Sequence, residues 1–103
     1  MDPVSAGHPE LVPFLDRAGR FTQWPVKRKL QLTALHWMAA LFEPGVVYRE
    51  RDINNILDDW ARFGDSARLR RDLCDLRLLE RHSDGSAYWR AADAAPKPVI
   101  EFL

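Results

Sequence analysis

The sequence has only one cysteine, Cys74, and three histidines that lie far apart along its 103 residues. One cysteine cannot form a disulfide within the chain, and one thiol with scattered histidines cannot build a metal site. No nucleophile has a base nearby in the sequence, and there is no glycine-rich phosphate loop. We therefore expect no metal, no cofactor and no catalytic site, so that the chain is not an enzyme.

An excess of charge of one sign is also missing, because 15 lysines and arginines balance 15 aspartates and glutamates. No overall field draws the chain to nucleic acid or to an anionic membrane, so any basic surface must be local. The sequence has no run of about 18 apolar residues, which a spanning helix requires, and no secretion-signal pattern at its start. We expect a cytoplasmic domain that has no membrane partner.

The composition that is present suits one small domain, since 47% of the residues are hydrophobic and 11% are aromatic. Residues 1–8 lack any periodic pattern and predict a flexible arm. Residues 9–90 hold the periodic segments and predict the folded domain. Residues 91–103 run through Pro96 and Pro98 to an apolar tip, which predicts a tail with no place in the core.

Hydrophobic spacing predicts a short helix over residues 10–15 and three longer helices over residues 26–42, 49–60 and 66–76. The strongest pattern is in residues 26–42, whose apolar stripe contains Leu30, Ala34, Trp37, Met38 and Leu41. Trp37 and Trp60 belong to such stripes and are expected in the core. Asp65 is a suitable N-cap for the last helix, because its carboxylate can accept a free backbone N–H.

Short extended segments are predicted between and after these helices. Residues 20–24 precede Pro25, which favours extended geometry, and predict a short edge strand or extended segment; residues 46–48 are β-prone. Residues 78–82 and 87–90 flank Asp84 and Gly85, a pair that favours a hairpin with a type I′ turn. Alternation along the second strand predicts that Tyr88 points inward and Trp89 outward.

The order of these elements is that of a winged helix-turn-helix. A long helix, a minimal strand, two further helices and a hairpin follow one another, and a short helix precedes them. In this fold the third helix can lie in the DNA major groove while the hairpin, or wing, reaches the flanking backbone. The expected class is therefore α+β, mainly α.

The chain also resembles a bacterial domain-of-unknown-function family, family 2087, over roughly residues 14–90. The residues that carry the resemblance are Gly19-Arg20-Phe21, Trp24-Pro25-Val26-Lys27-Arg28-Lys29, Phe42-Glu43-Pro44-Gly45, Tyr48, Ile53-Asn54, Leu57, Leu69-Arg70-Arg71-Asp72-Leu73, Leu78-Leu79-Glu80-Arg81, Gly85 and Tyr88-Trp89-Arg90. Members of this family occur alone or joined to helix-turn-helix regulators. The resemblance implies a link to transcriptional control.

The third long helix carries the candidate DNA contacts Arg68, Arg70 and Arg71, and the hairpin adds Arg81. Arginine can pair with phosphates or bind a guanine edge with two hydrogen bonds. The alternative is exposed ion pairing within the helix, because a carboxylate lies four residues after Arg68 and after Arg71. Arg70 has no carboxylate four residues later, where Cys74 stands.

A second basic cluster, Lys27-Arg28-Lys29, lies in the first turn of the longest predicted helix. Positive charge opposes the helix dipole there, but free N–H groups beside lysine and arginine can bind an anion. We expect an anion site at Lys27 and Arg28, with Arg70 contributing. The alternative is neutralisation within the fold by Glu10, Asp16 or Glu43.

These observations leave two main functions open. The first is the DNA-binding domain of a bacterial transcriptional regulator, acting as a dimer on double-stranded DNA through the six basic residues Lys27, Arg28, Arg68, Arg70, Arg71 and Arg81. The second is a protein-interaction module of the same shape that does not bind DNA and dimerises through the apolar tail. A redox switch at Cys74 is a minor alternative that needs nearby arginines to lower its pKa.

Overall fold

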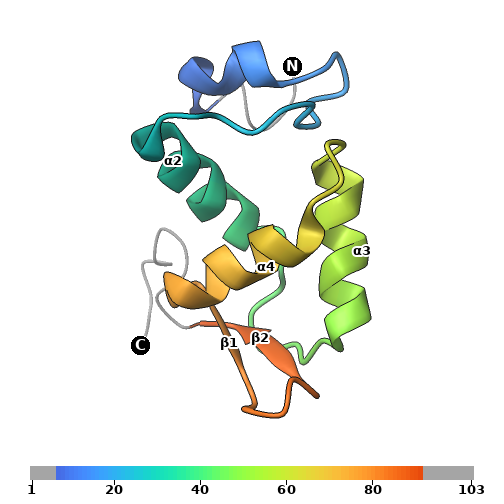
Figure 1. Cartoon of the computed structure of the whole chain (residues 1–103). Helices are drawn as coiled ribbons and strands as arrows, with labels where there is room; N and C mark the ends of the chain where they lie inside the picture. The colour runs from blue at the N-terminus through green and yellow to red at the C-terminus, as the bar shows by residue number, and fades with distance from the viewer. Residues whose placement is uncertain (1–6, 92–103) are drawn as a thin grey trace.

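The computed structural model describes residues 7–91, so the predicted tail from residue 92 onward and most of the predicted arm lie outside the described residues. In chain order the elements are the 3-10 helix η1 (Pro9–Phe14), the α-helices α2 (Arg28–Ala39), α3 (Glu50–Trp60) and α4 (Ser66–Asp75), and the strands β1 (Leu79–Arg81) and β2 (Tyr88–Arg90) (Figure 1). The predicted α+β class, mainly α, is confirmed. None of the helices in residues 7–91 has the length and apolar character needed to cross a bilayer.

The segment between η1 and α2 pairs with the end of α3. Phe21 is fully buried and forms an antiparallel bridge with Leu15 and a parallel bridge with Ala61. Its N–H also donates to the carbonyl of Trp60 at 2.8 Å. The extended segment predicted over residues 20–24 is therefore reduced to one bridging residue, which fixes the N-terminal part of the domain on α3.

Helix α2 is shorter than the helix predicted over residues 26–42. Val26 and Lys27 precede it, and Lys27 is the extended N-cap residue (φ −73°, ψ 130°). At the other end, Leu41 and Phe42 donate to carbonyls three residues back. Such bonds tighten the last turn and allow the apolar pattern to continue after the α-helix has ended. Phe42 enters the core from this turn and is fully buried.

Helix α3 begins with two hydrogen bonds from Arg49, its N-cap residue, to Asp52 in the first turn. The backbone N–H of Arg49 donates to Oδ2 of Asp52 at 3.0 Å, and the Arg49 side chain contacts the same carboxylate at 3.1 Å. Ile53 and Leu57 are fully buried one turn apart. The predicted spacing of this helix is confirmed, and its start differs by one residue.

Helix α4 begins directly after Asp65, as predicted, but the Asp65 carboxylate makes no capping hydrogen bond. Its backbone angles (φ −127°, ψ 52°) differ from the extended geometry that turns a capping side chain toward the free N–H groups. The expected carboxylate cap is therefore wrong, although the position of the helix start is right.

The hairpin has the predicted position and a different turn. β1 and β2 are antiparallel, and Glu80 lies opposite Trp89. His82 donates its backbone N–H to the carbonyl of Ala87 at 3.0 Å, which closes a four-residue loop. Within this loop only Gly85 has a positive φ, of 76°, whereas a type I′ turn needs two such residues. The predicted type I′ turn is therefore wrong.

Tyr48 pairs with the hairpin through a single antiparallel β-bridge. The N–H groups of Tyr48 and Tyr88 each donate to the carbonyl of the other residue at 2.8 Å. The β-prone segment predicted over residues 46–48 is thus represented by one bridge. This pairing attaches the hairpin to the connection between α2 and α3.

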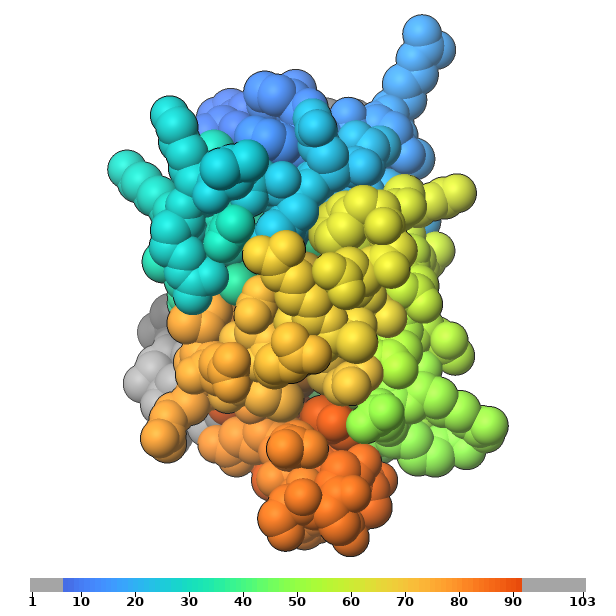
Figure 2. Space-filling view, in the orientation of Figure 1, coloured from blue at the N-terminus to red at the C-terminus, as the bar shows by residue number. Residues whose placement is uncertain are grey.

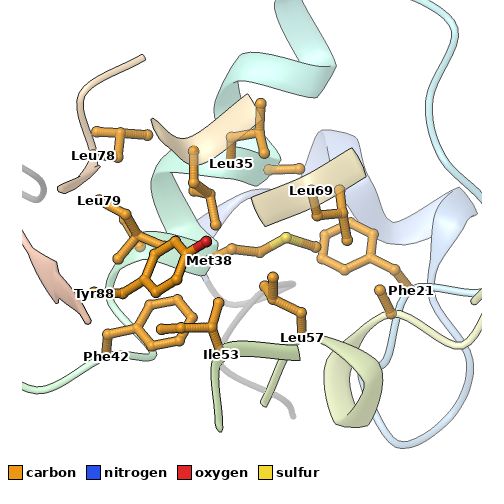
Figure 3. Packing of buried hydrophobic residues seen from close by; sticks show 14 of the residues in the cluster. Phe21, Leu35, Met38, Phe42, Ile53, Leu57, Leu69, Leu78, Leu79 and Tyr88 are labelled. Atoms are coloured by element: carbon orange, nitrogen blue, oxygen red, sulfur yellow. The ribbon is translucent and has the colours of Figure 1, made fainter. Parts of the chain in front are cut away.

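The core lies where α2, α3 and α4 meet the hairpin. Figure 3 shows the Met38 side chain at its centre, with Phe21 on one side and Tyr88 on the other. The predicted inward orientation of Tyr88 is confirmed, since only 2% of its surface is exposed. Trp37 and Trp60 were expected in the core. Neither is part of the buried core: Trp37 is partly buried against it, and Trp60 is partly buried and meets Trp37 edge to face, with ring centroids 5.0 Å apart.

Candidate functional site

Helix α4 presents arginines on one face of the domain. Leu69 and Leu73 are buried beneath it. The exposed positions on its outer side are Ala67, Arg68, Arg71 and Asp75. Figure 2 shows α4 and the hairpin on one face of the molecule, with the start of α2 above them on the same face. A large partner that approaches this face can therefore contact all three segments.

One of the two ion pairs expected along α4 is present. Nε of Arg68 lies 3.8 Å from Oδ2 of Asp72. Within the described part of the chain, Arg71 has no ion pair within 4 Å, so the expected contact with Asp75 is not made. An exposed pair of this kind contributes less than about 1 kcal/mol, so Arg68 can exchange Asp72 for another anion at little cost.

The Arg70 side chain has no carboxylate partner four residues later in α4, but it contacts two residues of α3. Its Nη1 donates to Oδ1 of Asn54, and its Nη2 lies 3.8 Å from Oε2 of Glu50. Only 19% of the Arg70 side chain is exposed. Arg70 therefore joins α4 to α3, and sequence reasoning missed both partners because they belong to another helix.

The arginines of α4 meet the hairpin at a hollow of about 200 Å³. Its lining residues are Glu50, Arg70, Arg71, Cys74, Asp75, Arg81 and Tyr88. They come from the start of α3, from α4 and from both strands. Arg71 and Arg81 are exposed, and among residues 7–91 neither forms an ion pair within 4 Å. Three arginines against two carboxylates give the hollow one net positive charge.

The floor of this hollow is held in place by a hydrogen bond between the hairpin and α3. The Tyr88 hydroxyl donates to Oε1 of Glu50 at 3.0 Å. A Cβ atom added at Gly85 would lie 3.7 Å from Nη1 of Arg81 and 3.8 Å from the same Glu50 oxygen. The Arg81 guanidinium therefore lies over the hairpin turn on the side that faces Glu50.

Cys74 lines the same hollow and does not have the low pKa that a redox switch needs. Burial raises the pKa of its thiol, and the opposing effects of Arg81 and then Arg70 do not cancel this rise. The sequence predicted that Arg70 and Arg77 would lower this pKa, and Arg70 does act in that direction. The predicted net lowering is wrong because the sulfur is half-buried against the apolar core, which disfavours the thiolate.

The basic cluster at the start of α2 is exposed and free of ion pairs. Within the described residues, Lys27, Arg28 and Lys29 have no carboxylate oxygen within 4 Å, and no acidic residue lies in the first turn. Nη1 of Arg28 donates to Oε1 of Gln31 at 3.2 Å. The alternative, neutralisation by Glu10, Asp16 or Glu43, is therefore not seen as an ion pair among the described residues.

The structure does not bring Arg70 to the basic cluster of α2. Lys27 lines a hollow beside η1, whereas Arg70 lines the hollow between α4, α3 and the hairpin, and these two hollows share no residue. Arg70 points to the start of α3 because Asn54 and Glu50 hold it there. The anion site predicted from Lys27, Arg28 and Arg70 together is thus divided into two separate places.

Trp24 and Trp89, the two tryptophans outside the predicted helical stripes, make contacts within the domain. Trp24 lies against Phe63 with ring centroids 5.7 Å apart. Trp89 donates its Nε1–H to Oε1 of Glu80 at 2.9 Å and meets the His82 ring edge to face. Both side chains are partly buried. In residues 7–91, no group of three or more histidine, cysteine, aspartate or glutamate side chains is placed to hold a metal ion.

Comparisons with known proteins relate most of the chain to one family. A sequence model described as "Uncharacterized protein conserved in bacteria (DUF2087)" matches residues 20–90, which include the whole of α2, α3, α4 and the hairpin. η1 precedes the matched residues. No curated protein and no solved structure matches the chain.

Proposed function

The chain belongs to the bacterial DUF2087 family, and from this premise we propose that it is the DNA-binding domain of a transcriptional regulator. In this proposal α4 is the recognition helix and the β1–β2 hairpin is the wing of a winged helix. The order of the elements supports this proposal. A winged helix has a short extended segment between its first two helices, and the bridge between Tyr48 and Tyr88 lies at the corresponding place, between α2 and α3.

The observation that carries the proposal is the pair formed by Arg71 and Arg81. One comes from α4 and the other from β1, and both line the same hollow. Both are exposed and neither has an ion pair in the described residues. Two guanidinium groups on a helix and an adjacent wing can bind phosphates of one DNA strand, which sets the position of the helix in the groove.

The other basic residues have different roles in this proposal. Arg68 faces outward from α4 and contacts DNA after it leaves Asp72. Arg28 binds a more distant phosphate at the start of α2, where backbone N–H groups without a helical partner favour an anion, whereas Lys27 lines the hollow beside η1. Arg70 acts indirectly, since its bonds to α3 set the angle between the two helices.

The proposal is tested by measuring binding to a random-sequence DNA duplex over a range of salt concentrations. Phosphate contacts release counterions, so the affinity should fall steeply as salt increases. With about four phosphates neutralised by Arg68, Arg71, Arg81 and the α2 cluster, the logarithm of the affinity should fall with a slope of about −3 to −4. An affinity that does not change with salt, or no binding at low salt, would contradict the proposal.

The alternative function is a protein-interaction module without DNA binding. Its dimerisation through the apolar tail concerns residues outside the described part. A different apolar surface, at η1 and the start of α2, favours a protein contact and is independent of the arginine-lined hollow.

A further inference from the structure

An apolar groove lies between η1 and the start of α2. Its volume is about 390 Å³, and its lining residues are Glu10, Pro13, Phe14, Val26, Lys27 and Leu30. Val26 is 93% exposed, and Val12 on η1 is 49% exposed. A valine with nearly its whole surface in water has no role in the core of this domain. Apolar surface gathered beside a groove in this way is typical of a protein contact.

The charges beside the groove indicate which partner fits it. Glu10 belongs to η1 and Lys27 precedes α2, so the two walls carry opposite charges. Within the described residues neither side chain has an ion pair within 4 Å. The groove therefore has an apolar floor, one acidic wall and one basic wall. A second copy of the same surface has the matching charges.

Two copies can face each other about a twofold axis in two simple ways. If the axis crosses the groove, η1 meets η1 and the two Glu10 side chains are opposed. If the axis runs along the groove, η1 of each copy meets the start of α2 of the other. Only the second arrangement places Glu10 of each copy against Lys27 of the other.

We propose that this groove is a homodimer interface, with a second copy of the chain as its occupant and two symmetric Glu10–Lys27 ion pairs at its edges. Figure 1 shows η1 at the end of the domain away from the hairpin. The dimer therefore leaves Arg71 and Arg81 open on both copies. The inference does not rest on DNA binding, and each can fail without the other.

The experiment is sedimentation velocity of the full chain at low ionic strength, from low to high micromolar concentration. The wild type should move from the monomer mass to twice that mass as the concentration rises. Val26→Asp should remain monomeric, and it should fold because this side chain is exposed. Val47→Asp is the matched control, since Val47 is 68% exposed on the loop before α3 and should leave the dimer unchanged.

Charge reversal tests the partner and the direction of the axis. Glu10→Lys and Lys27→Glu each oppose like charges and should weaken dimerisation at least about tenfold. The double variant Glu10→Lys with Lys27→Glu restores opposite charges and should recover it.

Three results would overturn the inference. The first is a wild type that is monomeric at every concentration, and the second is a double variant that dimerises as weakly as the single variants. The third is a dimer that is lost when residues 92–103 are removed but persists in Val26→Asp. The last result would assign the contact to the tail. Loss of DNA binding in Arg71→Ala with Arg81→Ala, while the dimer persists, separates this inference from the proposed function.

Discussion

The hydroxyl of Tyr88 on the hairpin donates a hydrogen bond to Oε1 of Glu50 at the start of α3, at 3.0 Å and across 38 residues of sequence. The other oxygen of the same carboxylate lies 3.8 Å from Nη2 of Arg70 on α4. One carboxylate thus joins the hairpin, α3 and α4. These three elements surround the arginine-lined hollow, so Glu50 fixes the geometry on which the proposed DNA contact depends.

Removing the Tyr88 hydroxyl should therefore loosen the hairpin. Tyr88→Phe keeps the buried ring and leaves Glu50 without its neutral donor, which should lower the free energy of unfolding by about 1.5 kcal/mol. Urea denaturation followed by tryptophan fluorescence measures the change. Ser83→Ala on the exposed turn is the control and should have little effect. A Tyr88→Phe variant as stable as the wild type would show that this bond contributes nothing.

Arg70 and Arg71 are neighbours in sequence, but truncating them should have very different effects on stability. Arg70→Ala removes the bonds to Asn54 and Glu50 and should cost about 1 to 3 kcal/mol of stability. Arg71→Ala removes no ion pair seen in the described residues and should change stability by less than about 0.5 kcal/mol. Thermal unfolding of both variants checks this difference. Equal losses of stability would contradict the roles assigned to them.

The contact at the start of α3 predicts a pH dependence. The side-chain hydrogen bond from Arg49, followed by its backbone N–H, holds the pKa of Asp52 below its ordinary value. A carboxyl whose pKa is lowered on folding stabilises the fold above its unfolded pKa, and this contribution disappears as pH falls below about 4. Asp52→Asn should therefore lower the melting temperature at pH 7 and have a smaller effect in acid.

Asp58→Asn on the same helix is the control for this pH dependence. The Asp58 side chain is exposed, so its replacement should change the melting temperature little at either pH. If Asp52→Asn lowered the melting temperature equally at pH 7 and at pH 2, the loss of stability would not be electrostatic.

Cys74 should react slowly with alkylating reagents. Burial raises the pKa of its thiol, so less thiolate is present at pH 8 than for an exposed cysteine. We expect iodoacetamide to modify the folded chain several-fold more slowly than the urea-unfolded chain. Arg81→Ala should slow the reaction further, because it removes the positive charge that most lowers this pKa. Equal rates in the folded and unfolded chains would contradict the assignment.

Local patterns were sufficient to predict the elements and their order. The spacing of Ile53 and Leu57 located α3, and the Asp84-Gly85 pair located the hairpin. The same patterns failed at element ends and turns. Leu41 and Phe42 continue the apolar stripe after α2 has ended, and the carboxylate of Asp65 makes no cap. These details depend on backbone angles that tertiary packing decides.

The candidate site was only partly predictable, since its key contacts join distant segments. Spacing within a helix reveals a pair such as Arg68 and Asp72, which is present. It cannot reveal that Glu50 of another helix binds Arg70. Nor can it show that Arg81 and Arg71 line the same hollow, because that depends on how the hairpin packs against α4. Only the inward orientation of Tyr88 indicated which face of the hairpin meets the helices.

The central claim is that Arg71 and Arg81 bind DNA phosphates together, and the salt dependence of duplex binding in the Arg71→Ala, Arg81→Ala double variant tests it most directly. Arg17→Ala, an exposed arginine on the loop after η1, is the matched control. The account predicts that the double variant lowers the steepness of the salt dependence by about two and weakens binding, while the control matches the wild type. An unchanged slope in the double variant, or an equal loss in Arg17→Ala, would contradict it.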